Sequence, residues 1–277
     1  MLVSRLTPAD RAALLAAGVK LWSIHPLLSR LPLWWRRKFY SRRLGLLHRH
    51  YGPVCDRLPL PAVRRQLVKA WLGRPFLDIA CSRYYFYLSY VHAHAARYDR
   101  AMLTDARDVI FQADPFAWEH TAPQEFFLEH RTETVASQWG NALWVRKAYG
   151  EAMLARIGHQ RVSCSGVTFG TTAGMLAYLR AMTDELALTT PRISGFPGYD
   201  QGLHNRLIWT DTFPQARILE NHTGPVLTMH GAPTEEFATD AAGRVYDREH
   251  RLVPVLHQYD RHESLAGPLL ATLAPDA

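Results

Sequence analysis

The sequence has little of what indicates a disulfide-stapled, zinc-binding or membrane-spanning protein. Its 277 residues include only three cysteines, which are odd in number, far apart and without a Cys-x-x-Cys pair: Cys55, Cys81 and Cys164. This argues against a disulfide framework or a structural zinc site and favours a reducing compartment. No apolar run approaches the roughly 20 residues that span a bilayer, and residues 1–8 lack the charged-then-apolar build of a secretory signal. A cytoplasmic location is therefore expected.

The chain is basic, with 32 Lys and Arg against 25 Asp and Glu and a formal net charge of +7. The positive charge either lies on a solvated surface with no binding role or attracts an anionic partner, such as a nucleotide diphosphate, an anionic lipid or nucleic acid. No recognition-helix or zinc-finger pattern is present, so nucleic acid is not expected as a partner. The most basic and aromatic stretch, residues 31–43, contains Trp34-Trp35-Arg36-Arg37. It predicts either peripheral contact of Trp34 to Arg43 with the inner face of a membrane or a surface helix with two buried tryptophans.

The composition, 48% hydrophobic and 21% charged, is that of an ordinary globular protein, and the chain is long enough for one large α/β domain. Thr7 reads as the N-cap of a helix that ends at Gly18, followed by a strand over residues 19–24. Because a nucleotide-binding α/β domain usually begins with a strand, the first strand is expected to be missing or supplied elsewhere. Helices are predicted over residues 60–72 and 81–96, the latter burying an apolar face.

Residues 101–116 have the pattern on which the functional prediction depends. An apolar run ends in Asp105, Arg107 and Asp108, apolar residues return, and the stretch stops at Asp114-Pro115. In open α/β sheets the ligand lies outside the carboxyl ends of the strands. Two carboxylates there, three positions apart, can hold one hard divalent cation that carries a diphosphate. Arg107 either contacts phosphate or pairs with Asp108 or Asp114 to hold the loop.

Residues 104–116, TDARDVIFQADPF, resemble the metal-binding signature of GT-A-type nucleotide-sugar glycosyltransferases, roughly (L/I)xDxRDVxFQxDPF. Later stretches match in the same order: CSGVTFG at 164–170, GYDQGLHN at 198–205 and VLHQYDRH at 255–262. The chain is also distantly similar to the collagen-modifying and glycogenin-like enzymes. The resemblance, from about Arg83 to His262, implies a single domain with a GT-A-like, Rossmann-type mixed sheet flanked by helices. Residues 1–80 would complete the nucleotide-binding half, and 81–262 would carry the metal, donor and acceptor sites.

The resemblance also implies roles for individual residues. A Mn²⁺ or Mg²⁺ ion would be held by Asp105, Asp108 and His257, with His230 as the competing third ligand. The donor would be bound by residues spread over the matched region: Arg83, Asp105, Arg107, Gly166 and Gln201. Asp200 and Glu129 are the candidate catalytic carboxylates. Each also has a purely structural interpretation, since Asp200 can complement a helix dipole and Glu129 can be a surface acid at a strand end.

The implied activity moves a sugar from a nucleotide-diphosphate sugar, with a UDP-sugar favoured, to a glycan or lipid-linked acceptor in surface polysaccharide or glycoconjugate synthesis. Inversion at the anomeric carbon would require Asp200 or Glu129 as a base, whereas retention would not. Two alternatives remain open. One is a metal-dependent phosphohydrolase or nuclease that uses the same acids. The other is a membrane-surface binding module built on residues 34–37.

Three further stretches carry structural expectations. Residues 161–170 are predicted as strand, turn and strand, with Gly166 allowing close approach of a ligand to the backbone. Residues 189–198 are rich in Gly and Pro and are predicted as a loop, either a lid or a connector. From Glu263 onward no regular element is predicted.

Overall fold

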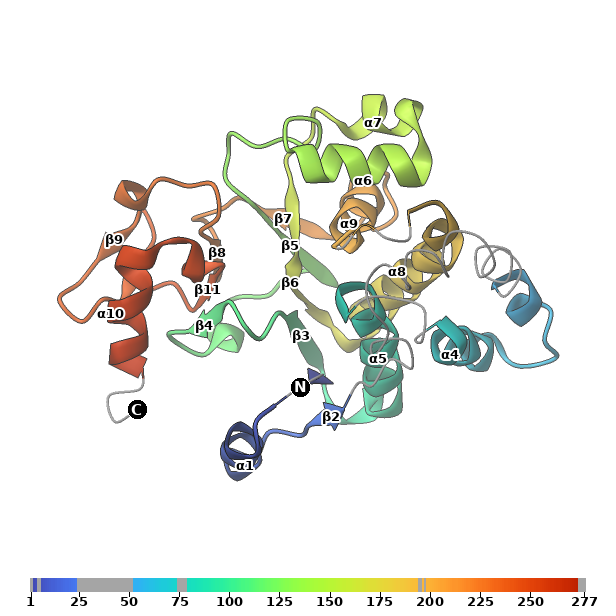
Figure 1. The fold of residues 1–277 in the computed structure, drawn as a ribbon, viewed down its shortest axis with the longest axis horizontal. Coiled ribbons are helices and arrows are strands. Elements are labelled where there is room, and N and C mark those ends of the chain that lie inside the picture. Colours follow the sequence, from blue (N-terminus) through green and yellow to red (C-terminus); the bar gives the residue numbers. More distant parts are fainter. Residues whose placement is uncertain are drawn as a thin grey trace.

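The computed structural model describes residues 2–3, 6–23, 52–73, 79–193, 196 and 198–273, which form a mixed α/β protein (Figure 1). The Trp34–Arg43 segment lies outside the described residues. The helices are α1 (Pro8–Ala16), α4 (Ala62–Gly73), α5 (Ile79–Ala93), α6 (Trp139–Tyr149), α7 (Glu151–Ile157), α8 (Thr172–Ile193), α9 (Asp200–Ile208) and α10 (Glu263–Leu273). Single 3₁₀ turns are η3 (Ala95–Arg97), η4 (Pro115–Ala117), η5 (Thr234–Glu236) and η6 (Tyr259–Arg261).

The central sheet has four strands in the order β3, β6, β5, β7. These strands are β3 (Arg100–Thr104), β5 (Gln124–Leu128), β6 (Ser163–Thr171) and β7 (Arg217–Leu219). β6 runs antiparallel to both of its neighbours, and β5 and β7 are parallel. The sheet is therefore mixed, as predicted.

A second sheet of three strands lies beside the first and consists of β4 (Val109–Phe111), β11 (Val255–His257) and β8 (Val226–Thr228). β11 is the middle strand, antiparallel to β4 and parallel to β8. Residues 105–108 connect β3 of the central sheet to β4 of the second sheet, so the acidic stretch crosses the junction of the two sheets. A small antiparallel pair, β9 (Ala238–Thr239) and β10 (Val245–Tyr246), follows β8 in the chain.

The alternation of side chains along the strands produces a layered core. Phe126 of β5 packs among α5, α8 and α9, whereas its neighbour Phe127 packs toward β8 and β11. In the second sheet, Val255 faces that same shared core, while Leu256 packs with Leu269 of α10 on the opposite face. Figure 1 shows the result: α5, α8 and α9 lie on one side of the central sheet, and the second sheet and α10 lie on the other.

The N-terminal prediction was half right. Thr7 caps α1, with its hydroxyl accepting from the amide of Asp10 at 3.1 Å. The helix is not the first element, because β1 (Leu2–Val3) precedes α1 and pairs in parallel with β2 (Trp22–Ser23), in a two-stranded sheet separate from the central one. The predicted buried face of the 81–96 helix was confirmed: Tyr84, Leu88 and Val91 of α5 are all buried.

Three element predictions were wrong. Residues 163–171 form one continuous strand, because β3 and β5 pair with β6 along its two edges. The predicted 189–198 loop is wrong for residues 189–193, since α8 continues through Ile193 and the hydroxyl of Thr189 bonds the carbonyl of Glu185 at 2.7 Å. The C-terminal stretch is not featureless but forms α10, whose Leu269 is buried.

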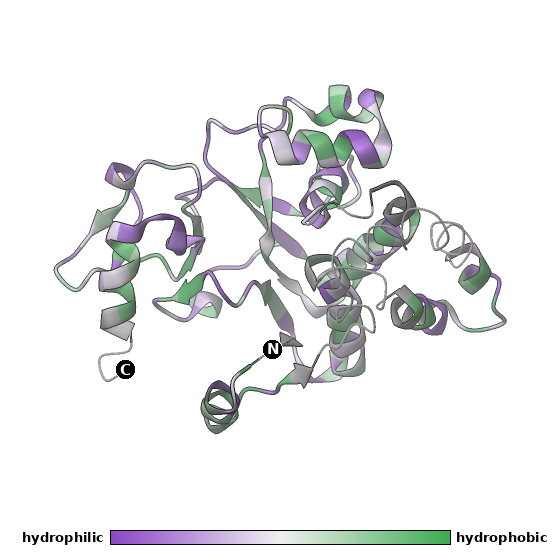
Figure 2. Ribbon diagram, viewed as in Figure 1, coloured by the Kyte–Doolittle hydropathy of each residue, from purple (hydrophilic) through white to green (hydrophobic). Residues whose placement is uncertain are grey.

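Hydrophilic and hydrophobic residues are interspersed along the helices (Figure 2). In the part of the chain that the structure describes, no helix combines the length and the hydropathy that crossing a membrane requires.

Candidate active site

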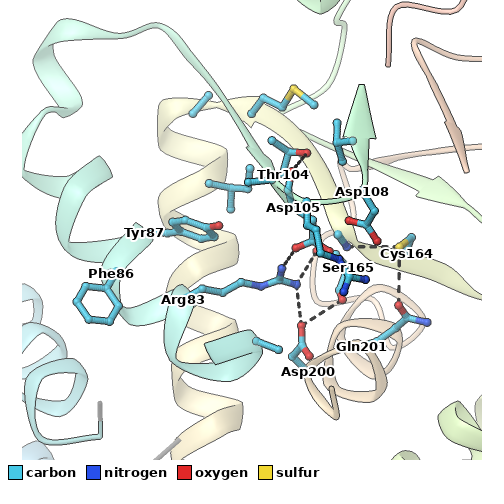
Figure 3. A pocket seen from close by; sticks show the side chains of 18 of the residues that line it. Arg83, Phe86, Tyr87, Thr104, Asp105, Asp108, Cys164, Ser165, Asp200 and Gln201 are labelled. Atoms are coloured by element: carbon cyan, nitrogen blue, oxygen red, sulfur yellow. Dashed lines mark hydrogen bonds and ion pairs between the residues drawn. The ribbon is translucent and has the colours of Figure 1, made fainter. Parts of the chain in front are cut away.

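A cleft of about 1260 Å³ opens beside the junction of the two sheets. It is lined by residues of α5, β3, the 105–108 connection, the middle of β6 and the start of α9. Aromatic side chains form part of the wall, namely Phe86, Tyr87, Tyr90 and Tyr98. Polar groups converge elsewhere on it, including Arg83, Asp105 and Asp200 (Figure 3). A concave site with an aromatic wall and a few convergent charged groups is the usual form of a small-molecule site.

Asp105, Asp108 and His257 lie together, with one potential ligand atom from each within 4.8 Å of the others. Asp105 follows β3, and its amide donates to the carbonyl of Gly166 at 2.8 Å. Asp108 immediately precedes β4. The antiparallel register pairs His257 of β11 with Val109 of β4, which brings the histidine next to both acids. The structure therefore gathers the three residues that the resemblance assigns to a cation.

His257 is fully buried behind the acids. Its Nε2 has no hydrogen-bond partner among the described residues and lies 3.8 Å from Oδ2 of Asp105, beyond hydrogen-bond length. A buried nitrogen without a partner requires an explanation, because burial without a bond costs free energy. Two carboxylates and one imidazole nitrogen form a donor set that suits Mn²⁺ or Mg²⁺, so these residues fit the expected ion.

Gly166 of β6 lies directly against this cluster. A β-carbon at residue 166 would lie 2.6 Å from Nε2 of His257 and 2.8 Å from Oδ2 of Asp105. Real β-carbons essentially never make such contacts, so any other residue here would force His257 or Asp105 to move. In this structure the groups that approach Gly166 are two of the candidate metal ligands, and the approach of a bound ligand to this backbone stays a prediction.

Arg83 joins the metal cluster to Asp200. Its guanidinium forms ion pairs with Asp105 and, at 2.9 Å, with Asp200 (Figure 3). Burial would raise the pKa of Asp105, but Arg83 and His257 outweigh it and hold that pKa below its usual value. Burial likewise opposes the charge of Arg83, yet Tyr84 and the two carboxylates raise the pKa of Arg83 well above its ordinary value. The arginine and Asp105 are both ionised at neutral pH.

Asp200 is the first residue of α9 and is almost fully buried. Its Oδ2 accepts from Arg83, from the hydroxyl of Tyr84 at 3.1 Å and from the hydroxyl of Ser165 at 3.2 Å. These contacts fix the carboxylate at the cleft wall, which it lines together with Gln201. The position at a helix N-terminus was predicted, but the three donors were not.

Glu129 does not line the cleft. It follows β5 and is buried, with its two carboxylate oxygens accepting from Gln201 at 3.0 Å and Gln138 at 3.1 Å. Burial, reinforced by the charge of Glu133, raises the pKa of Glu129 to about 7. As a candidate catalytic carboxylate, Glu129 is therefore set back from the cleft, with its partner Gln201 at the wall. The competing interpretation as a surface acid was wrong.

The remaining predicted residues are placed as follows. Arg107 is highly exposed at the cleft and pairs only loosely with Asp260, at 3.7 Å, rather than with Asp108 or Asp114. His230 follows β8 and is not in the metal-ligand group. Between the two candidates for third ligand, the structure places His257 beside the acids.

Sequence reasoning missed two contributors. Tyr84 was predicted only as a core residue, and its hydroxyl bonds to Asp200. Cys164 was noted only as an isolated thiol in a matched stretch, and its sulfur lies 3.5 Å from Nδ1 of His257. The CSGVTFG match was the available signal for Cys164, while nothing in the helical spacing of α5 distinguishes a tyrosine that bonds from one that only packs.

The chain matches no protein-family model, and no curated protein sequence matches it. Any assignment of chemistry therefore depends on the geometry of the cleft.

Proposed function

We propose that this protein is a metal-dependent glycosyltransferase that takes its sugar from a nucleotide-diphosphate donor. The observation that carries the proposal is the meeting of Asp105, Asp108 and His257 beside a cleft that Arg83 and Asp200 also line. A GT-A-like, Rossmann-type arrangement is part of the proposal. The mixed central sheet, with helices on one face and the acidic connection at its edge, supports it.

The three clustered residues would hold Mn²⁺ or Mg²⁺. When bound, the cation supplies positive charge that stabilises a departing diphosphate. Asp108 is buried and Asp105 is partly exposed, so the cluster can be reached from the cleft while His257 supports it from behind. Of these groups, Asp105 also binds Arg83, which keeps the carboxylate ionised and oriented.

The rest of the cleft suits the other parts of such a donor. Tyr87, Tyr90 and Tyr98 offer aromatic surface on which a nucleoside base can stack. The exposed guanidinium of Arg107 is positioned to contact phosphate oxygens, for which its planar fork of donors is suited.

In the transfer step, the bond between the anomeric carbon and the diphosphate oxygen breaks and the acceptor oxygen bonds to that carbon. The acceptor hydroxyl proton must leave. Asp200 is the cleft-lining carboxylate available to take it if the reaction inverts, whereas Glu129 lies behind Gln201 and does not reach the cleft. If the reaction retains configuration, the same fixed Asp200 orients the donor sugar. A glycan or lipid-linked molecule remains the proposed acceptor.

The proposal is tested by thermal denaturation with a panel of nucleotide sugars, each with and without Mn²⁺. We expect one nucleotide class to raise the melting temperature only when Mn²⁺ is present, because diphosphate and cation bind together. The Asp105→Asn variant should lose this joint shift. Release of phosphate from the nucleotide without any acceptor would instead identify a phosphohydrolase, and absence of any nucleotide-dependent shift would overturn the proposal.

A further inference from the structure

A row of polar side chains leads from the wall of the cleft, beside His257, into the interior. It contains Cys164 of β6, Gln201 of α9 and Glu129 after β5. Cys164 and Glu129 are buried, with exposed fractions of 2% and 1%. Figure 3 shows Cys164 between the acidic cluster and Gln201. This row connects a candidate metal ligand to a carboxylate that does not line the cleft.

The hydrogen bonds in the row have a single consistent direction. Above its pKa of about 7 the carboxylate of Glu129 only accepts, so the amide of Gln201 turns its NH₂ group toward it, at 3.0 Å. The carbonyl oxygen of Gln201 is then left facing Cys164, whose S–H donates to it at 3.8 Å. The sulfur is thereby free to accept, and it accepts the amide N–H of Gly166 at 3.4 Å.

The same sulfur lies 3.5 Å from Nδ1 of His257. The S–H proton of Cys164 points at Gln201 and is not available to the histidine. The hydrogen bond between the sulfur and Nδ1 of His257 therefore needs a proton on Nδ1. A neutral histidine with a proton on Nδ1 has its lone pair on Nε2. That is the nitrogen without a hydrogen-bond partner, 3.8 Å from Asp105. The row thus leaves Nε2 of His257 unprotonated, with a lone pair that can bind a cation.

We propose that Cys164 is a positioning residue that holds His257 in its Nδ1–H form, so that Nε2 faces the cation. Metal-binding histidines commonly donate their second nitrogen to a neighbouring group, which fixes the tautomer and the ring orientation. Here the acceptor is a thiol sulfur, which Gln201 and Glu129 orient in turn. The inference rests on the metal site of the proposed function, and the tautomer can be measured independently of it.

The first experiment reads the tautomer directly in the cation-free protein at about pH 8, where unperturbed histidine is neutral. Protein labelled with ¹⁵N-histidine distinguishes protonated from bare ring nitrogens by chemical shift, and His257→Asn identifies the relevant signals. We expect Nδ1–H in the parent. In Cys164→Ala the acceptor is removed, and the proton should move toward Nε2. Cys164→Ser keeps an acceptor and should retain the parent pattern.

The second experiment measures the dissociation constant of Mn²⁺ alone by electron paramagnetic resonance. Loss of such an outer contact typically weakens metal binding about 10- to 100-fold, which is the expected effect of Cys164→Ala. Cys164→Ser should remain near the parent. Cys55→Ala is the matched control, because it removes another buried thiol away from the cleft and should change neither the tautomer nor the affinity.

The outcomes separate the two proposals. If the parent does not bind Mn²⁺, the metal site of the proposed function fails, while the tautomer measurement still decides the role of Cys164. If the parent binds Mn²⁺ and its His257 already carries the proton on Nε2, the inference is overturned. It is also overturned if Cys164→Ala remains folded with an unchanged tautomer. Should Cys164→Ala not fold, Cys164→Ser and the parent spectrum decide.

Discussion

Gly166 and His257 approach so closely that a β-carbon on residue 166 would lie 2.6 Å from Nε2 of the histidine. The glycine is therefore a condition for bringing the histidine of β11 to the acids that follow β3. In Gly166→Ala the methyl group should push His257 and Asp105 apart, because both ring and carboxylate atoms would be under 3.0 Å away. We expect Mn²⁺ binding to fall at least about tenfold, measured by calorimetry.

Gly267→Ala is the control for this variant. A β-carbon there would meet nothing within 4 Å beyond its two chain neighbours, so the variant places no atom against the candidate metal ligands. Its Mn²⁺ affinity should equal that of the parent. Parent-like Mn²⁺ binding by Gly166→Ala would mean that the cation does not use His257.

A second prediction concerns the ion pair between Arg83 and Asp200. Arg83→Met leaves Asp200 buried without its cationic partner, and breaking a buried pair from one side costs about 3–5 kcal/mol. We expect the free energy of unfolding in urea to fall by roughly that amount. Because Asp200→Asn removes the uncompensated charge, the double variant should recover much of the loss. Equal stability of the single and double variants would contradict the buried-pair interpretation.

The acidic part of the site could be predicted from the sequence because it is local. Asp105 and Asp108 are three residues apart at the end of a strand, and such spacing needs no tertiary information. His257 is different, since it reaches the acids only through the register of β11 against β4. No periodicity specifies that register, and the histidine was found only because a motif resemblance supplied it.

The failed predictions share one cause, which is tertiary packing that overrides local signals. The small residues around Gly166 read as a turn, but β6 is a central strand paired on both edges. The stretch from Glu263 onward carries no local signal of a regular element, yet α10 forms there with Leu269 buried against the second sheet. Glu129, a candidate catalytic carboxylate at a strand end, does not line the cleft. Whether a strand end faces a ligand or another side chain depends on what α9 places there, in this case Gln201.

A third prediction follows from the raised pKa of Glu129, about 7 in the folded protein. The unfolded chain releases this proton near pH 4.3, so between about pH 4.3 and 7 the folded state holds a proton that the unfolded state has lost. Stability must therefore fall as pH rises through that window and then level off. From pH 5 to pH 8 the loss from this group is on the order of 2–3 kcal/mol.

Glu129→Gln cannot titrate and should lack this component. The measurement is urea unfolding of the parent and Glu129→Gln at several pH values across the window, without metal. The difference in unfolding free energy between the two should shift in favour of the variant as pH rises. A difference that does not change with pH would mean that Glu129 is ionised throughout, with an ordinary pKa.

The last prediction separates a binding role from a structural role for Arg107. Its side chain is 79% exposed, and its nearest carboxylate, on Asp260, is 3.7 Å away. Arg107→Gln should therefore leave the free energy of unfolding within about 0.5 kcal/mol of the parent. If the guanidinium meets the donor phosphates, nucleotide-diphosphate affinity should weaken up to about fivefold at low salt, and the effect should shrink as salt screens it.

Arg217→Gln makes the same charge change at an exposed position on β7 that does not line the cleft, so its affinity should match the parent. Loss of stability with unchanged nucleotide affinity in Arg107→Gln would restore the structural interpretation of Arg107.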